Sequence, residues 1–191
     1  MKKIRLLCVS MLFFIAAEGF CFFPEIIFFG DSIVWQQKWS QYWDRPVENK
    51  AVPASMVVGI MNRAKKFLDA ETYKAFFEGG INDILLGRKA TNIAADYEKM
   101  IEMAKIKAPN AKIYIISVLP IVKGDNKNKE IITLNSYLEE IAESHGATFI
   151  DLHQYFVDAD GITARRDLVR SVHLMPKGQQ LMADKLEPYI N

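Results

Sequence analysis

Short apolar runs alternate along the chain with longer amphipathic segments, and this alternation most constrains the fold. The short runs are typical of strands and lie at 25–30, 45–52, 73–80, 112–120 and 147–152. The longer segments have helical periodicity and lie at 55–70, 92–108, 128–146 and 176–190. Strands that alternate with helices of this length build a parallel sheet with helices on both faces. The sequence therefore predicts an α/β domain.

Three tryptophans recur at every fourth position after the first predicted strand: Trp35, Trp39 and Trp43. This spacing places them on one stripe of a helix. We expect the stripe to pack in the core rather than to form a binding platform, because large aromatic side chains are mostly buried.

The first residues differ from the rest of the chain. Three cations open it: Lys2, Lys3 and Arg5. A short apolar run and small residues follow, which is the layout of a secretory signal peptide. The run is short for a membrane anchor, and a buried first strand would not usually open with three cations. We predict a signal peptide at 1–22, a mature domain at 23–191 without a stable membrane span, and a secreted or periplasmic location.

The cleavage point of this signal stays open between about Phe20 and Glu25, because aromatic residues follow the small ones at once. Cys21 is an alternative site of lipid attachment, although the preceding Phe20 fits that poorly. Cys8, the other cysteine, lies inside the predicted signal. The mature domain is thus expected to lack an internal disulfide and a cysteine cluster for a metal.

The charge balance argues against two classes of partner. The chain has 24 Lys and Arg against 23 Asp and Glu, a formal net charge of +1 over 191 residues. No basic excess favours nucleic acid, and no basic face favours a membrane surface. We expect a small or neutral molecule as the partner.

Polar residues follow the predicted strands where they end. Residues 30–32 (Gly-Asp-Ser) follow the first strand, residues 79–83 (Gly-Gly-Ile-Asn-Asp) follow the third, and a long irregular segment contains His173. Right-handed crossovers bring the carboxyl ends of the strands to one edge of the sheet, where such sheets bind ligands. We expect Ser32, Asn82 and His173 to lie along this edge.

These residue types suit acyl transfer, which needs a nucleophile, a base and donors for an oxyanion. Each also has a simpler explanation: Ser32 as a helix cap, Asn82 as a turn residue and His173 as a surface histidine. Helix capping explains His145, and His153 stays a weaker alternative base.

The order and context of these motifs resemble the SGNH or GDSL hydrolase family. The resemblance rests on GDS after the first strand, GxND after the third and VHL-x-x-x-G before the last helix. It implies a flavodoxin-like three-layer α/β/α fold with about five parallel strands, and ester hydrolysis through a serine acyl-enzyme without a metal or other cofactor. By matching positions, it implies Ser32 as the nucleophile and His173 as the general base. It also implies the backbone N–H of Ser32 and the side chain of Asn82 as oxyanion donors.

Two positions depart from the family pattern. Ala54 stands where a glycine N–H is the third oxyanion donor, and an alanine there is strained if its φ is positive. Arg170 stands where the family has an aspartate three residues before the histidine, and an arginine cannot accept the imidazole N–H. Three outcomes stay open: Asp167 or another loop acid such as Asp160 substitutes, a backbone carbonyl orients His173, or the site is weak. We favour the carbonyl and a Ser–His dyad, with Arg170 turned to solvent or towards an anionic substrate.

The leading functional hypothesis is an exported serine esterase that acts on a small acyl or acetyl ester. The acyl group could sit on a glycan, a lipid or another carrier. The alternative is a catalytically weakened relative that binds a glycan or another partner. A cofactor-binding flavodoxin-like domain is less well supported, because no phosphate-binding loop is present in the sequence.

Overall fold

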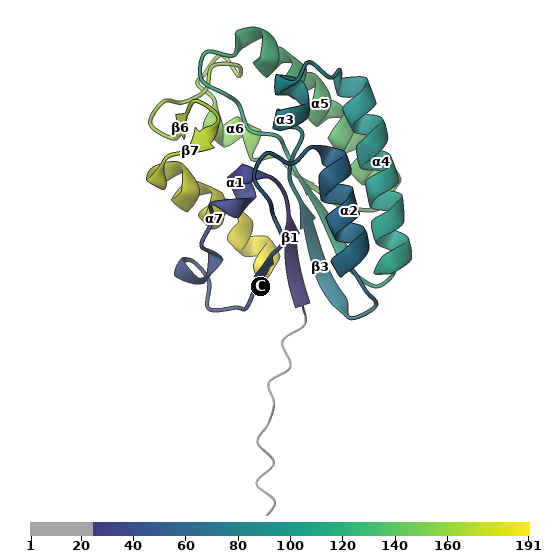
Figure 1. Cartoon of the computed structure of the whole chain (residues 1–191). Helices are drawn as coiled ribbons and strands as arrows, with labels where there is room; N and C mark the ends of the chain where they lie inside the picture. Colours follow the sequence, from purple (N-terminus) through teal and green to yellow (C-terminus); the bar gives the residue numbers. More distant parts are fainter. Residues whose placement is uncertain (1–24) are drawn as a thin grey trace, which may run out of the picture.

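A parallel sheet forms the centre of the structure, a computed structural model that describes residues 25–191 (Figure 1). Its strands are β1 (Glu25–Phe29), β2 (Glu48–Asn49), β3 (Thr72–Phe77), β4 (Lys112–Ile116) and β5 (Thr148–Ile150). They lie in the order β2-β1-β3-β4-β5, and every neighbouring pair is parallel. This flavodoxin-like order confirms the predicted fold. The predicted signal peptide at 1–22 and its cleavage site lie outside the described residues.

Helices cover both faces of this sheet, which makes three layers (Figure 1). One face packs against α2 (Val57–Phe67), α3 (Ile81–Leu85), α4 (Ala90–Lys107) and α5 (Asp125–Ser144). The other face packs against α1 (Ser32–Trp35), α6 (His153–Phe156) and α7 (Pro176–Ile190). Within residues 25–191, none of the helices is both long and apolar enough to cross a bilayer.

The strand sequences supply apolar residues to both layers. Along β1, Ile27 and Phe29 join the core cluster under α2 and α4, whereas Ile26 and Phe28 join the cluster under α7. Successive side chains of a strand point to opposite faces, so a strand covered on both sides must be apolar throughout. This requirement explains why β1 is a continuous apolar run.

An aromatic ladder crosses the sheet on the α7 side. The rings of Phe28 and Phe76 stack 4.3 Å apart, and Phe76 and Tyr114 stack 4.4 Å apart. Trp39 lies 4.6 Å from Phe28, and Trp43 stacks 4.8 Å from Trp39. Such pairs add about 0.5–1.5 kcal/mol each beyond the area that they bury. The predicted packing role of these two tryptophans is confirmed.

The single tryptophan helix was a wrong prediction. Helix α1 ends at Trp35, whose side chain is 59% exposed, and Trp39 begins a separate short 3₁₀ helix, Trp39–Gln41. The physical reason is a tertiary contact: the side-chain amide of Asn49 donates to the carbonyl of Val34 at 2.9 Å. The same carbonyl accepts the N–H of Gln37 at 3.1 Å, a 3₁₀-type bond with which the helix ends.

The segment before α7 is more ordered than the sequence predicted. Strands β6 (Val169–Arg170) and β7 (His173–Leu174) form an antiparallel hairpin in which Arg170 is paired with His173. The carbonyl of Ser171, in the turn, accepts the N–H of Val122 at 2.9 Å. The hairpin is thereby fixed to the loop that follows β4.

The aromatic ladder predicts a large difference between two tryptophans. Trp39→Ala should lower the free energy of unfolding by about 3–5 kcal/mol, because it leaves a cavity beside Phe28. Trp35→Ala is the matched control and should change it by less than about 1 kcal/mol, because this side chain is exposed. Urea unfolding followed by circular dichroism measures both values. Equal losses would contradict the packing described here.

Candidate active site

The turn after β1 places Ser32 at the carboxyl edge of the sheet. A Cβ on Gly30 would lie 2.6 Å from the side chain of Val34, so only glycine fits there. Asp31 is fully buried, and its carboxylate accepts the N–H of Ile33 at 2.9 Å, which caps α1. Ser32 follows as the first residue of α1 and is half-buried. Gly30 and Asp31 therefore each have a structural role in the turn, and Asp31 rather than Ser32 caps the helix.

The β6–β7 hairpin brings His173 to this serine. Nε2 of His173 lies 3.0 Å from Oγ of Ser32, across 141 residues of chain. His173 is exposed, so the pair is open to solvent. A hydroxyl in hydrogen-bond contact with an imidazole is the arrangement that activates serine nucleophiles.

Asp167, the predicted possible third member, is engaged elsewhere. Its carboxylate lies 2.6 Å from Nζ of Lys177 and 3.2 Å from the guanidinium of Arg165. The hydrogen bond from Lys177, and then that from Arg165, lower the pKa of Asp167. These contacts join Asp167 to the start of α7 rather than to the imidazole.

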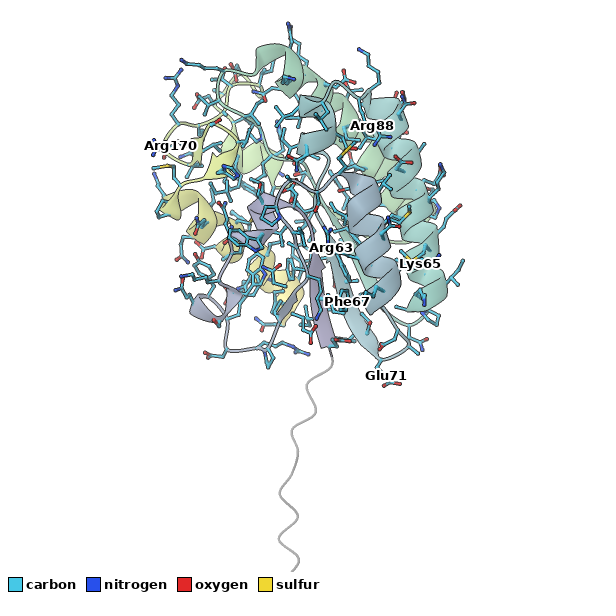
Figure 2. The ribbon with its side chains drawn as sticks, viewed as in Figure 1. Arg63, Lys65, Phe67, Glu71, Arg88 and Arg170 are labelled. Carbon is cyan, nitrogen blue, oxygen red and sulfur yellow. The ribbon has the colours of Figure 1, made fainter. Side chains whose placement is uncertain are left out.

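The second imidazole nitrogen has no acceptor among the described groups: no hydrogen bond joins Nδ1 of His173 to a described carboxylate or backbone carbonyl. Asp160 accepts hydrogen bonds from the backbone and hydroxyl of Thr163, within its own loop. Arg170 is exposed and lies at the margin of the molecule (Figure 2). Asp160 and Asp167, the predicted substitutes for the missing aspartate, are therefore not hydrogen-bonded to His173.

The other two histidines have structural surroundings. His145 ends α5, where Nδ1 lies 3.0 Å from the carbonyl of Ile141, as expected for a helix end. His153 is buried, and burial lowers its pKa. Its Nε2 has no hydrogen-bond partner in the described part of the chain. The histidine in contact with Ser32 is His173 instead.

Two backbone donors are available near the serine. In residues 25–191, the N–H groups of Ser32 and Ala54 donate to no other protein group. Ala54 is exposed and has φ 59°, in the left-handed region. A side chain in this region costs about 1–2 kcal/mol relative to the right-handed region. The alanine therefore keeps the backbone conformation that a glycine would adopt without strain.

Asn82 holds two of the site's segments together. Its amide nitrogen donates to Oδ2 of Asp31 at 3.2 Å and to the carbonyl of Ser55 at 3.0 Å. These two bonds use both amide hydrogens and connect the Ser32 turn to the Ala54 loop. An oxyanion would have to take one of these hydrogens from its present acceptor.

Two residues that support the site were not predicted from the sequence. Arg63, on α2, donates to the carbonyls of Gly30 and Lys50 and to the hydroxyl of Ser55, each at 2.9–3.0 Å (Figure 2). Nothing in the local pattern marked it. Glu78 follows β3 and is 1% exposed, with no partner for either carboxylate oxygen in the described structure. An acid within the apolar run Tyr73–Gly79 was the available signal.

Two buried acids lie at neighbouring strand ends. Burial raises the pKa of Asp31 to about 6, with a smaller contribution from the charge of Asp83 and against the hydrogen bond from the N–H of Ile33, which lowers it. Burial, and then the charge of Asp31, raise the pKa of Glu78 well above its ordinary value. Because Asp31 accepts two N–H bonds and Glu78 accepts none, Asp31 carries the charge at neutral pH and Glu78 carries the proton.

This assignment predicts a pH-dependent cost. The folded protein holds a proton on Glu78 that the unfolded chain loses above its ordinary pKa of 4.5, so stability falls as pH rises from there. Glu78→Gln removes this titration and keeps the shape. Its free energy of unfolding should match that of wild type near pH 4 and exceed it increasingly towards pH 8. Urea unfolding across this range measures the difference, and parallel curves would contradict the assignment.

Comparisons with known proteins bear on the fold and the family of this chain. A Streptococcus pneumoniae protein named for platelet activating factor has 20% identity and a TM-score of 0.80, over 91% of this chain and 87% of that one. A member of the lipolytic protein G-D-S-L family from Veillonella parvula has 26% identity and a TM-score of 0.73, over 86% and 96%. No individually curated protein matched. The family model of the GDSL-like lipase/acylhydrolase family matches residues 28–181, and the chain therefore belongs to this family.

Proposed function

We propose that this protein is a serine ester hydrolase in which Ser32 is the nucleophile and His173 the general base. The observation that supports this most directly is the 3.0 Å contact between Nε2 of His173 and Oγ of Ser32. Family membership supports hydrolysis of esters. The exposure of the pair supports access by a substrate.

In this mechanism Oγ of Ser32 attacks the ester carbonyl carbon while His173 takes its proton. The carbonyl oxygen becomes an oxyanion, which the N–H groups of Ser32 and Ala54 and the amide of Asn82 would stabilise. Collapse breaks the bond to the alcohol, which leaves with the proton from His173. Water then attacks the acyl-enzyme with the same histidine as base, which releases the acid and restores the serine.

The histidine works without a carboxylate partner in this proposal. A triad acid fixes the tautomer of the imidazole and stabilises its cation. Here the hairpin position of His173 fixes the ring in place, and solvent orients it, because no backbone carbonyl of the described residues accepts a hydrogen bond from Nδ1. This arrangement is a Ser–His dyad with lower turnover than a full triad.

The proposed substrate is a small acyl or acetyl ester, with the acyl group on a glycan, lipid or other carrier. The cationic, short apolar start of the chain supports export to the periplasm or the outside. N-terminal sequencing of protein recovered outside the cytoplasm tests export. A catalytically weakened binding protein is the second candidate, favoured by Arg170 in the position of the expected aspartate.

The enzyme proposal predicts that two single changes abolish ester hydrolysis. Ser32→Ala and His173→Ala should each lower kcat with 4-nitrophenyl acetate by roughly a thousandfold or more, while thermal unfolding shows a folded domain. His145→Ala is the matched control and should keep wild-type turnover. Wild-type turnover in Ser32→Ala, or no hydrolysis of any small ester by wild type, would favour the binding protein.

The hairpin register predicts a gain of activity. Arg170 is directly paired with His173, and paired side chains lie on one face of a hairpin about 5 Å apart. Arg170→Asp should therefore supply the missing acceptor and raise kcat at least roughly tenfold, within the ten-thousandfold that a triad acid can contribute. Arg170→Asn is the control for loss of the cation alone. Equal activities of Arg170→Asp and Arg170→Asn would contradict the dyad.

A change at Asp167 should have little effect on turnover. The kcat of Asp167→Asn should stay within about tenfold of that of wild type.

A further inference from the structure

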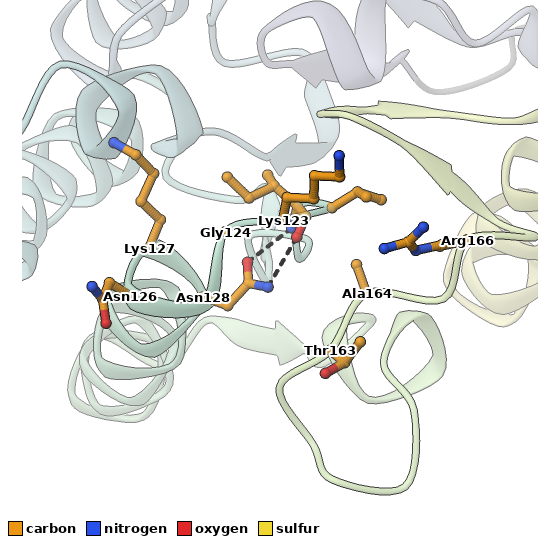
Figure 3. Close-up of a pocket in the computed structure, with 10 residues that line it drawn as sticks. Lys123, Gly124, Asn126, Lys127, Asn128, Thr163, Ala164 and Arg166 are labelled. Atoms are coloured by element: carbon orange, nitrogen blue, oxygen red, sulfur yellow. Dashed lines mark hydrogen bonds between the residues drawn. The ribbon is translucent and has the colours of Figure 1, made fainter.

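A second concave site lies beside the hairpin that carries His173. This cavity of about 600 Å³ is formed between the loop after β4 and the segment that follows α6 (Figure 3). Its volume falls in the range of small-molecule sites. The mechanism proposed above uses none of the residues that line it.

The charged side chains that line this cavity, among those described, are all cations: Lys123, Lys127 and Arg166. Lys123 and Arg166 come from opposite walls, and the guanidinium is directed into the space between them (Figure 3). Within the described side chains, neither lies in an ion pair with a carboxylate. Nζ of Lys127 instead lies 3.4 Å from the carbonyls of Ile84 and Leu85, at the end of α3.

A buried amide holds the two walls in position. Asn128 is 1% exposed; it accepts the N–H of Ile121 and donates to the carbonyl of Ile121, both at 2.9 Å (Figure 3). The same amide donates to the carbonyl of Ile162 at 3.0 Å, on the opposite wall. The cavity is therefore framed by buried hydrogen bonds rather than by surface side chains alone.

The cavity is connected to the active site through the hairpin. Val122 lines the cavity, and its N–H donates to the carbonyl of Ser171, two residues before His173. A ligand group held by Lys123 and Arg166 would thus lie beside the segment that positions the base.

We propose that this cavity binds an anionic, oxygen-rich group of the ester substrate, such as a phosphate, sulfate or carboxylate. The protein would then prefer acyl esters of anionic carriers to esters of neutral alcohols. Arg and Lys recognise such groups through charge-assisted hydrogen bonds, with Arg able to bind two oxygens at once. This inference rests on the proposed function, because it assigns a substrate class to the same site.

A matched pair of esters tests the substrate preference: 1-acetylglycerol 3-phosphate and 1-acetylglycerol, which differ only in the phosphate. Wild type should hydrolyse the phosphorylated ester with a kcat/KM at least roughly tenfold higher. Lys123→Gln combined with Arg166→Gln should abolish this preference and leave kcat/KM for the neutral ester within about twofold. Lys129→Gln changes a lysine of α5 outside the cavity and should keep the full preference.

Inorganic phosphate, titrated against each protein by NMR, tests the cavity independently of catalysis. Wild type and Lys129→Gln should bind it, and the double variant should bind at least roughly tenfold more weakly. Equal kcat/KM for the two esters in wild type, or equal phosphate affinity in wild type and the double variant, would overturn the inference. If neither ester is hydrolysed, the proposed function fails, and the phosphate titration alone decides for or against the cavity.

Discussion

The rest of the site depends on the hydrogen bonds that the buried carboxylate of Asp31 accepts. This carboxylate is fully buried, and it accepts hydrogen bonds from the N–H of Ile33 and from the side-chain amide of Asn82. Those bonds fix the helix that begins at Ser32 and attach the end of β3 to the end of β1. A buried charge without hydrogen-bond donors would cost free energy. The charge of the carboxylate therefore fixes the positions of its two donors. The carbonyl of Ser55 shares the same amide, which brings the Ala54 loop into the arrangement.

A protonated acid beside this carboxylate makes the arrangement sensitive to pH. Glu78 occupies the strand end next to Asp31 without a hydrogen-bond partner in residues 25–191. A negative charge on Asp31 is tolerated because two N–H donors form hydrogen bonds to it. A second negative charge, on Glu78, would have no such donor. This pair of acids therefore carries one buried charge, and the stability of the site is greatest where Glu78 needs no forced protonation. The turn that carries Ser32 begins at Asp31, one member of this pair.

How far the sequence could predict this site depends on how local each feature is. Ser32 and Asn82 were found because strand ends of a parallel sheet share an edge, which follows from alternation along the chain. The tryptophan helix was mispredicted because the helix ends where the carbonyl of Val34 accepts both the N–H of Gln37 and the side-chain amide of Asn49, fifteen residues beyond Val34. The hairpin of His173 escaped prediction because its strands are two residues long and depend on a bond to Val122. The ion-pair partners of the loop acids are not visible in the local sequence. Asp167 pairs with Lys177, ten residues further along the chain.

The central claim is a covalent acyl-enzyme on Ser32, formed with His173 as the base and no carboxylate behind it. Acid quench during turnover of 4-nitrophenyl acetate, followed by peptide mass spectrometry, tests it most directly. The acyl-enzyme mechanism predicts an acetyl group on the peptide that contains Ser32 in wild type, and no acetylated peptide in Ser32→Ala. An acetyl group on another residue, or continued turnover by Ser32→Ala without one, would contradict it.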